Sequence, residues 1–263
     1  MKTRSILLSI IVVFTVSSCI IRSLYPFYTK DTIYFEERFL GTWEGFDGKP
    51  NKWIVVSVED VYHVQNALDM RNCKGPLCRE RITTEIEAYF LIIKVKDEIA
   101  IYLMTPFKIK NDLFLDVFPI NNYCSDGSGN GCEMKEDFKS FNIKTHSLLK
   151  LDVLNNDTVK MHLFDKFELR KLIENNKIKI KYHKIEQSDG TKDNLYLLTA
   201  SSVELQRFIE KFIRSKEFKE DYDIDDSKLN RIKNREDTFE FIKNIIAGNT
   251  PSNGIRIPIV DLN

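Results

Sequence analysis

Residues 148–163 read Leu-Leu-Lys-Leu-Asp-Val-Leu-Asn-Asn-Asp-Thr-Val-Lys-Met-His-Leu, and this stretch decides the fold class. Two runs in which apolar and polar residues alternate flank the turn residues Asn155, Asn156 and Asp157. Alternation with a period of two is typical of a β-strand, and the Asn-Asn-Asp cluster is typical of a tight connection. The stretch therefore predicts an antiparallel hairpin with one buried face and one wet face.

Similar runs of β-branched and aromatic residues recur on the N-terminal side, separated by turn signals such as Asp47-Gly-Lys-Pro50. The patterns predict strands at 39–44, 53–58, 61–64, 84–96, 99–104, 113–118, 141–144, 147–154 and 158–163. No helix of crossover length is predicted between these strands, so a parallel sheet is disfavoured. The predicted fold class is mainly β (α+β), an antiparallel meander that forms a barrel or a sandwich, with C-terminal amphipathic helices.

The pattern changes after residue 164. Asp165 and Glu168 form a capping signal for a helix that ends near Asn175, and Ser201 and Glu204 form a capping box for a second helix. Between them, the alternating lysines of residues 177–182 predict an edge strand. A polar stretch at 216–235 precedes an amphipathic helix at 238–247.

The N-terminus has the three parts of an export signal. Lys2 and Arg4 precede an apolar run at residues 6–16, and Ser17 and Ser18 precede Cys19. The run is shorter than the roughly 20 apolar residues that a membrane-spanning helix needs. An ordinary secretory peptide or an uncleaved anchor is the alternative interpretation.

Residues 16–19, Val-Ser-Ser-Cys, resemble the lipobox of bacterial lipoproteins. The resemblance implies cleavage before Cys19 and acylation of its thiol, for example with palmitate. Two or three acyl chains hold a protein on a membrane essentially permanently. No acidic residue follows Cys19 directly, and lipoproteins of this kind are generally sent to the outer membrane, so we expect a lipid-anchored protein of the cell envelope.

These features divide the chain into four parts: a lipoprotein signal peptide at 1–18, an acylated tether and entry segment at 19–37, a β-rich domain with packed helices at 38–218, and a helical or extended tail at 219–263. The whole chain carries 39 basic and 39 acidic side chains, and the signal peptide removes two of the basic ones. This near-neutral balance lacks the basic face that nucleic-acid binding requires, so nucleic acid is excluded as a partner.

Four cysteines remain once Cys19 carries lipid. They form two local pairs, Cys73 with Cys78 and Cys124 with Cys132, and disulfides persist in the compartment that the export signal predicts. Three connectivities are possible, and the two local pairs are the simplest. A four-cysteine zinc site is the alternative, and the oxygen-rich loop at 126–130 could attract calcium but lacks the spaced carboxylates of an EF-hand.

Residues 39–43, Phe-Leu-Gly-Thr-Trp, resemble the opening strand of lipocalin-like barrels, in which the indole of a Gly-x-Trp closes the base of the barrel. Several segments together resemble, in order, a family of uncharacterised bacterial lipoproteins found largely in Bacteroidetes: Ser23–Tyr28, Gly41–Trp43, Leu113–Pro119, Thr145–His146 and Leu197–Gln206. No activity, ligand or catalytic residue is implied by this resemblance. The two cysteine loops and the tail after Phe218 depart from the family pattern.

Three residues are candidates for a ligand site. Trp43 could line a cavity, although buried aromatic side chains of β proteins mostly serve packing. Asp116 is a charged residue in an apolar run, so it must face water, find a partner or shift its pKa. His146 lies in a segment that matches the family. The four histidines lack metal-site spacing, and no pattern predicts a catalytic residue, a metal or a cofactor.

Three hypotheses about function follow. The first is a non-enzymatic barrel module that binds a small apolar ligand or an envelope protein. It predicts a large apolar cavity beside Trp43, and side chains that fill this volume would exclude a ligand carrier. The second is a structural accessory subunit of an envelope complex, recruited through an exposed apolar patch for which the helix at 238–247 is the candidate. The third, an enzyme, would require His146 within hydrogen-bond reach of a carboxylate in a cleft.

Overall fold

The computed structural model describes residues 21–45, 52–63, 87–95, 98–123, 144–164, 166–185, 195–214 and 226–246. Eight strands in these ranges form the barrel: β2 (Gly41–Gly45), β3 (Lys52–Ser57), β4 (Tyr89–Val95), β5 (Glu98–Ile109), β6 (Asp112–Tyr123), β7 (His146–Val153), β8 (Thr158–Leu163) and β11 (Asp226–Lys233). The remaining elements are β1 (Arg22–Ser23), η1 (Lys30–Thr32), η2 (Glu37–Phe39), α4 (Lys166–Glu174), β9 (Tyr182–Ile185), β10 (Leu195–Leu198), α5 (Ser202–Phe212) and α7 (Arg235–Ile246).

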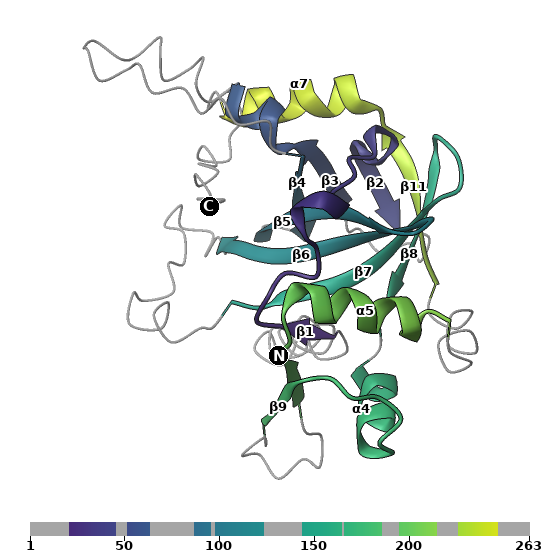
Figure 1. Ribbon diagram of the computed structural model, residues 1–263. Coiled ribbons are helices and arrows are strands. Elements are labelled where there is room, and N and C mark those ends of the chain that lie inside the picture. The colour runs from purple at the N-terminus through teal and green to yellow at the C-terminus, as the bar shows by residue number, and fades with distance from the viewer. Residues whose placement is uncertain are drawn as a thin grey trace, which may run out of the picture.

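The barrel is an antiparallel meander (Figure 1). Strands β2 to β7 each pair with the next strand along the chain, and β11 pairs with both β8 and β2 to close the ring. The mainly β fold class and the barrel architecture that the alternation predicts are thus confirmed. The hairpin of β7 and β8 is also confirmed, with Leu149 opposite Leu163 and Val153 opposite Val159.

The eighth barrel strand overturns the prediction of a polar stretch at 216–235. Residues 226–233 form β11, so part of the tail that we separated at residue 219 belongs to the barrel. The strand is polar, and among residues 228–233, whose side chains the structure describes, Leu229 is the one buried in the core. Such a strand lacks the alternation of apolar and polar residues that predicts strands from a sequence. Its pairing depends on two neighbouring strands that are distant in the sequence.

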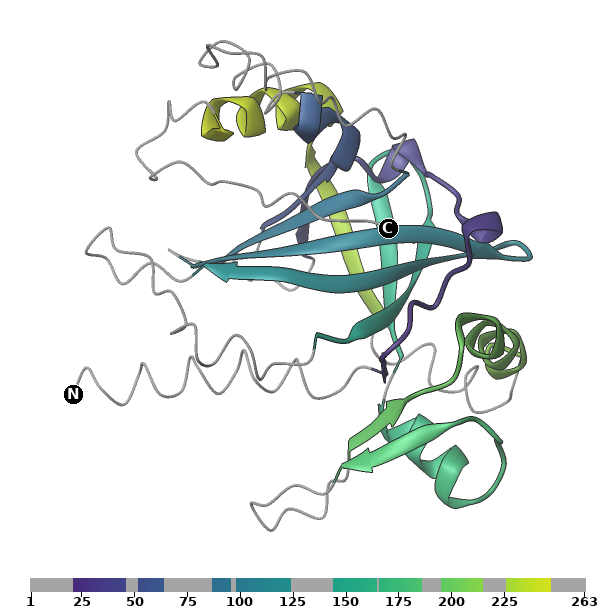
Figure 2. The same cartoon turned by 60° about the vertical axis from the view of Figure 1, so that its left-hand side comes forward.

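A short sheet extends the barrel wall beyond β7. Strand β1 pairs antiparallel with β7 and parallel with β10, and β10 pairs with the edge strand β9. Figure 2 shows β9, β10 and α4 as a group on one side of the barrel. The strand predicted at 177–182 is wrong for residues 177–181, which are in no strand, and the edge strand β9 begins at Tyr182.

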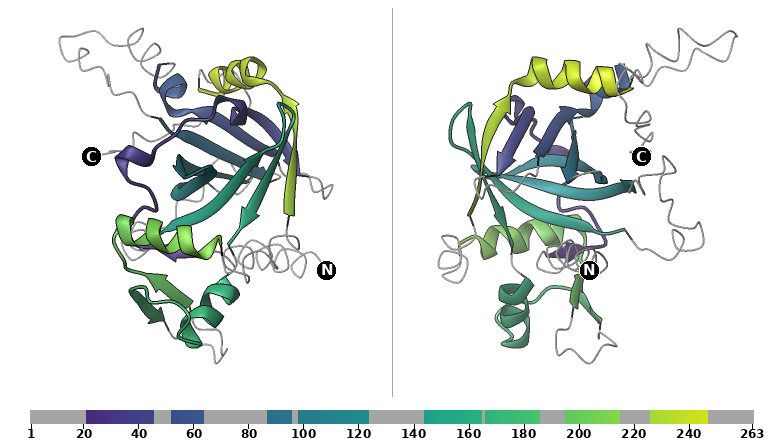
Figure 3. Two further views of the ribbon diagram at one scale, coloured as in Figure 1. Left: turned by 45° about the vertical axis from the view of Figure 1, so that its right-hand side comes forward. Right: turned by 180° about the vertical axis from the view of Figure 1, so that it is seen from behind.

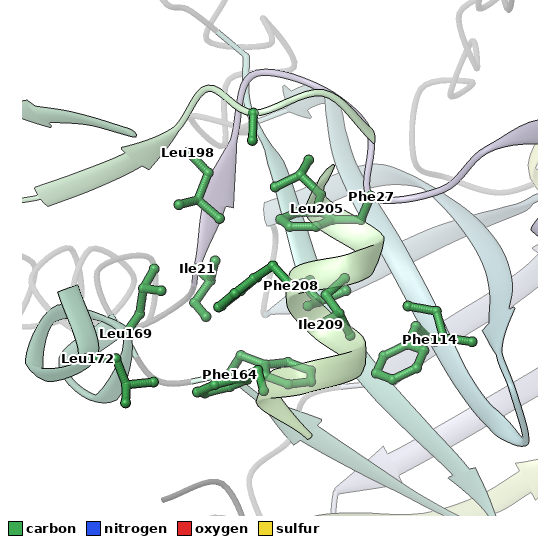
Figure 4. Close-up of a cluster of buried hydrophobic side chains, with 14 of the residues drawn as sticks. Ile21, Phe27, Phe114, Phe164, Leu169, Leu172, Leu198, Leu205, Phe208 and Ile209 are labelled. Carbon is green, nitrogen blue, oxygen red and sulfur yellow. The ribbon is translucent and has the colours of Figure 1, made fainter. Parts of the chain in front are cut away.

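Helices α4, α5 and α7 and the helical residues 58–63 cover the outer wall. Helix α5 begins at the predicted capping box, in which the Ser201 hydroxyl accepts the Glu204 N–H and the Glu204 carboxylate accepts the Ser201 N–H. Its apolar face, with α4 and β1, forms a cluster around Phe164 and Phe208 against the barrel (Figure 4). Helix α7 lies over β2 and β3 (Figure 3).

Helix α7 buries its apolar side chain Ile242 against the outer faces of β3 and β4. The barrel therefore covers part of the apolar face that the accessory-subunit hypothesis assigned to this helix, since Ile242 is buried and Phe241 partly buried there. The strand predicted at 61–64 is also wrong, since residues 58–63 are helical and Val58, Val61 and Tyr62 pack into the same cluster. The strand predicted at 141–144 lies almost entirely outside the described residues.

The outer face of the β7–β8 hairpin is not wet as predicted. Lys150 and His162 point outward from the barrel and are both buried, as is Leu148 beside them. The chain between β8 and β11 returns over this wall as α4 and α5, so residues on both faces are covered. Alternation showed which residues share a face but not what covers the outer one.

Candidate functional site

The predicted site residues fall in three places. Cys19, Cys73, Cys78, Cys124 and Cys132 lie outside the described residues. Asp116 and His146 meet on the outer wall of the barrel. Trp43, the third ligand-site candidate, lies apart from these two, inside the barrel.

Trp43 occupies the closed end of the barrel, the end covered by η2. Its side chain has no exposed surface, its ring packs 6.0 Å from that of Phe39, and its indole Nε1 donates to the Phe39 carbonyl at 2.9 Å. Beside it, the Tyr89 hydroxyl accepts the Glu36 N–H at 2.7 Å and donates to the Glu36 carbonyl at 3.0 Å. These contacts tie the entry segment across the end of the barrel.

Arg231 of β11 completes this closure. Its guanidinium lies 4.3 Å from the centre of the Trp43 ring and donates to the carbonyls of Arg38 and Asn156, each at 2.6 Å. Gly41 allows this approach: a Cβ there would lie 2.5 Å from Nη1 of Arg231 and 2.8 Å from the Lys233 carbonyl oxygen. Its φ of +141° is a further reason for glycine at this position.

The predicted ligand cavity beside Trp43 is wrong. The inward-pointing side chains at and next to its level are buried, including those of Val55, Leu91, Met104, Leu115, Leu151, Val159 and Met161. They fill the middle of the barrel because Leu, Met and Val from all sides meet there, as is usual for an eight-stranded barrel. A ligand enclosed deep in the barrel is therefore excluded.

The opposite end is different, and we call it the mouth. It is the end where β3, β5 and β7 begin and where β4 and β8 end. Four inward-pointing apolar side chains toward this end are partly buried, Trp53, Ile93, Tyr102 and Leu163, whereas Val117 is buried. Trp43 and Trp53 are directly paired across β2 and β3, but Trp43 is fully buried whereas Trp53 is only partly buried.

Arg22 stands on the rim of the mouth. It pairs with Ser147, and Ser147 pairs with Val117 on its other side; paired residues point to the same face of a sheet, so all three point inward. Burial raises the pKa of the Tyr102 phenol, and the neighbouring Arg22 guanidinium partly offsets this rise. Burial also lowers the pKa of Arg22 itself. The mouth therefore combines apolar side chains with one half-buried cation.

Asp116 and His146 form the second arrangement. Asp116 is buried, and its carboxylate receives two hydrogen bonds: one oxygen lies 2.7 Å from Nδ1 of His146, and the other accepts the Phe27 N–H at 3.0 Å. The His146 ring is 17% exposed and lies against Phe118, with ring centres 4.7 Å apart. The carboxylate thus joins β6 and β7 to the entry segment.

Burial raises the pKa of Asp116, and the hydrogen bonds from His146 and Phe27 only partly oppose this. The geometry meets one condition of the enzyme hypothesis, since His146 has a carboxylate partner. In the described part of the chain, however, no nucleophile is hydrogen-bonded to Nε2, and the hydroxyl of the adjacent Ser23 donates to the Leu198 carbonyl instead. The charged residue at 116 in an apolar run is therefore explained by its structural role, which is to link β6 and β7 to the entry segment.

Sequence reasoning missed a third polar group, on the outer wall of β6, β7 and β8. Lys150 Nζ lies 2.9 Å from Asp152 and 3.2 Å from Asp112, and Nε2 of His162 lies 2.9 Å from Asp152. The register of the hairpin, which sets Lys150 opposite His162, is the feature of the sequence that could have predicted this polar group. These ion pairs compensate the burial of Lys150 and His162.

Within the described ranges, no three or more His, Cys, Asp or Glu side chains are grouped so that they could hold a metal ion. None of the helices in those ranges is both long and apolar enough to cross a membrane. A scan against models of protein families matched none, and searches of curated proteins and of solved structures also found no match. The architecture alone defines the class: a closed, eight-stranded antiparallel β-barrel with additional strands and helices on its outer wall.

Proposed function

We propose that this chain is a lipid-anchored lipoprotein of the bacterial cell envelope, attached through Cys19 to the outer membrane, whose barrel binds an apolar group at its mouth. The observation that carries the binding role is the gradient of burial toward the mouth along β3, β4, β5 and β8. Side chains are fully buried around Trp43 and partly exposed around Trp53, Tyr102 and Leu163.

The gradient matters because inward-pointing apolar side chains normally have no contact with water. Covering them gains about 25 cal/mol per Å² of apolar surface, which favours an apolar partner at this end. The filled middle of the barrel limits how far such a partner can enter. The proposed activity is therefore shallow binding at the mouth rather than transport of an enclosed ligand.

The anchor is supported by the export pattern of residues 1–19. A chain held by acyl groups needs no membrane-spanning element of its own. Mass spectrometry of the protein extracted from its own membrane tests this part. A diacylated or triacylated Cys19 at the new N-terminus supports it, and an unmodified Cys19 in the extracted protein overturns it.

A fluorescence titration tests the binding role. The chain has two tryptophans, Trp43 in the closed end and Trp53 at the mouth. The uncharged probe N-phenyl-1-naphthylamine should bind to the chain beginning at Ile20, which contains every described element, and should receive energy from Trp53.

A Trp53→Glu variant tests the location of the probe, because it keeps Trp43 as the energy donor and places a carboxylate at the mouth. It should bind the probe more weakly than the unaltered chain. Absence of probe binding to the unaltered chain would overturn the proposed binding role. Equal affinity in the variant would place the probe elsewhere.

A further inference from the structure

The hydroxyl of Tyr102 is an exception among the buried tyrosine hydroxyls of the described chain. Burial raises the pKa of Tyr102, and it also raises the pKa of three other tyrosines. Each of those three hydroxyls has a hydrogen-bond partner within the protein: Tyr28 with Thr105, Tyr89 with Glu36, and Tyr196 with Glu174. The Tyr102 hydroxyl has no hydrogen bond to any residue that the structure describes.

Tyr102 points into the barrel from β5, close to the mouth. It pairs with the buried Leu91, and Met104, two residues further along β5, is fully buried in the barrel interior. The next residue pair toward the mouth is Ala100 with Ile93. Ala100 has only a methyl group beside the Tyr102 ring, so its own strand leaves the ring accessible from the mouth.

A buried hydroxyl without a partner costs free energy, because it gives up a hydrogen bond to water and receives none in return. Arg22 is close enough to influence the pKa of the Tyr102 phenol, but a guanidinium has only donors and cannot accept the hydroxyl proton. The indole N–H of Trp53 also has no acceptor among the described residues, whereas that of Trp43 at the closed end donates to the Phe39 carbonyl. The mouth therefore presents hydrogen-bond donors among apolar side chains.

We propose, on the basis of the proposed binding at the mouth, that the ligand is an uncharged apolar molecule with a carbonyl oxygen, as in a ketone or an ester, and that this oxygen accepts a hydrogen bond from the Tyr102 hydroxyl. An acceptor is needed because the indole N–H of Trp53 is a donor only and the phenol proton has no acceptor in the described chain. Burial raises the pKa of Tyr102 and lowers that of Arg22, and both shifts favour neutral groups at this rim. An uncharged ligand suits this environment.

Two aromatic compounds of nearly equal size test this proposal. Benzophenone carries a carbonyl group where diphenylmethane carries a methylene group. Their binding to the chain beginning at Ile20 is measured by equilibrium dialysis at neutral pH, for the unaltered chain and for Tyr102→Phe. The variant keeps the ring and removes the hydroxyl, so it should weaken the binding of benzophenone about fivefold relative to that of diphenylmethane, as expected for the loss of one hydrogen bond.

Tyr34→Phe is the matched control, because it removes an exposed tyrosine hydroxyl near the other end of β5, where the Tyr34 N–H donates to the Pro106 carbonyl. It should leave the affinity for both compounds unchanged. Ala100→Leu tests the location of the site. Its larger side chain lies between the Tyr102 ring and the mouth, so it should weaken the binding of both compounds alike.

A measurement on the ligand provides a second test should Tyr102→Phe fail to fold, as judged by circular dichroism. A hydrogen bond lowers the infrared stretching frequency of a ketone carbonyl. The carbonyl band of benzophenone bound to the unaltered chain should therefore lie at lower frequency than that of benzophenone in hexane. An unshifted band would overturn the hydrogen bond.

The outcomes separate the identity of the ligand from the proposed function. Equal changes for benzophenone and diphenylmethane in Tyr102→Phe would overturn the hydrogen bond and leave binding at the mouth intact. Tighter binding of the anion diphenylacetate than of benzophenone would overturn the uncharged ligand. Failure of the unaltered chain to bind either neutral compound would overturn both proposals.

Discussion

The guanidinium of Arg231 lies 4.3 Å from the centre of the Trp43 ring, which joins the last barrel strand to the first. The same guanidinium donates to backbone carbonyls of the entry segment and of the β7–β8 turn, at Arg38 and Asn156. One side chain therefore fastens three separate parts of the chain at the closed end. Without Arg231, the carbonyls of Arg38 and Asn156 would lose this charged hydrogen-bond donor. We therefore expect Arg231 to contribute more to stability than an ordinary surface arginine.

Arg231→Ala should lower the free energy of unfolding by roughly 2–4 kcal/mol, because it removes charge-assisted hydrogen bonds and the cation–π contact together. Urea denaturation of the chain beginning at Ile20 measures this change. Arg235→Ala, which removes an exposed ion pair, should change the same quantity by less than about 1 kcal/mol. Equal effects of the two substitutions would contradict the role assigned to Arg231.

Gly41→Ala should also destabilise the barrel, by about 2 kcal/mol or more, because the added Cβ meets the Lys233 carbonyl and the backbone has a positive φ. Arg231→Ala should not rescue this variant, since the backbone contact and the φ remain. Thermal melts of the single and double variants measure the result. Recovery of stability in the double variant would instead show that the destabilisation comes from the clash of the added Cβ with the Arg231 side chain.

Shortening the chain tests the assignment of β11. A chain that ends at residue 246 keeps every described element and should unfold cooperatively. A chain that ends at residue 218 lacks the strand between β8 and β2 and leaves both edges unpaired, so it should lose cooperative unfolding or aggregate. Native-like near-ultraviolet circular dichroism of the shorter chain would contradict this prediction.

His146→Gln should raise the pKa of Asp116 further, because the hydrogen bond and charge of His146 oppose the rise caused by burial. A carboxyl group with a raised folded-state pKa stabilises the fold most below its unfolded pKa of about 3.9, and this contribution is lost as the pH rises through the folded pKa. In the variant, that loss should shift to higher pH. Carbon-detected NMR titration of Asp116 measures the shift, with the exposed His183→Gln as a control that should leave it unchanged.

The capping box of α5 should show the opposite pH dependence. Hydrogen bonds from the Ser201 backbone and hydroxyl lower the pKa of Glu204 to about 2. Its contribution to stability is therefore present above the unfolded pKa of about 4.3 and is lost as the pH falls toward 2. Ser201→Ala should move the pKa of Glu204 upward and lower the free energy of unfolding by about 1 kcal/mol at neutral pH. Ser202→Ala, one residue beyond the cap, should change neither the pKa of Glu204 nor the free energy of unfolding.

The sequence by itself determined the elements that depend on local chemistry. Alternation located most barrel strands and the β7–β8 hairpin, since a strand with one inward face repeats every two residues. Capping residues located α5, because Ser201 and Glu204 satisfy N–H groups at the start of that helix whatever it packs against. Local patterns of the same kind also lead us to expect an export signal that ends at Cys19.

Tertiary structure alone decided the features that depend on distant partners. The residues of β11 are too polar to predict a strand from the sequence. They form a strand because β8 and β2 each have an edge whose backbone groups need hydrogen-bond partners. Asp116 and His146 were separate candidates until the pairing of β6 with β7 brought them together. Trp43 was expected beside a cavity, but Arg231 and the facing Leu, Met and Val side chains fill its end of the barrel, and the exposed apolar surface lies at the mouth instead.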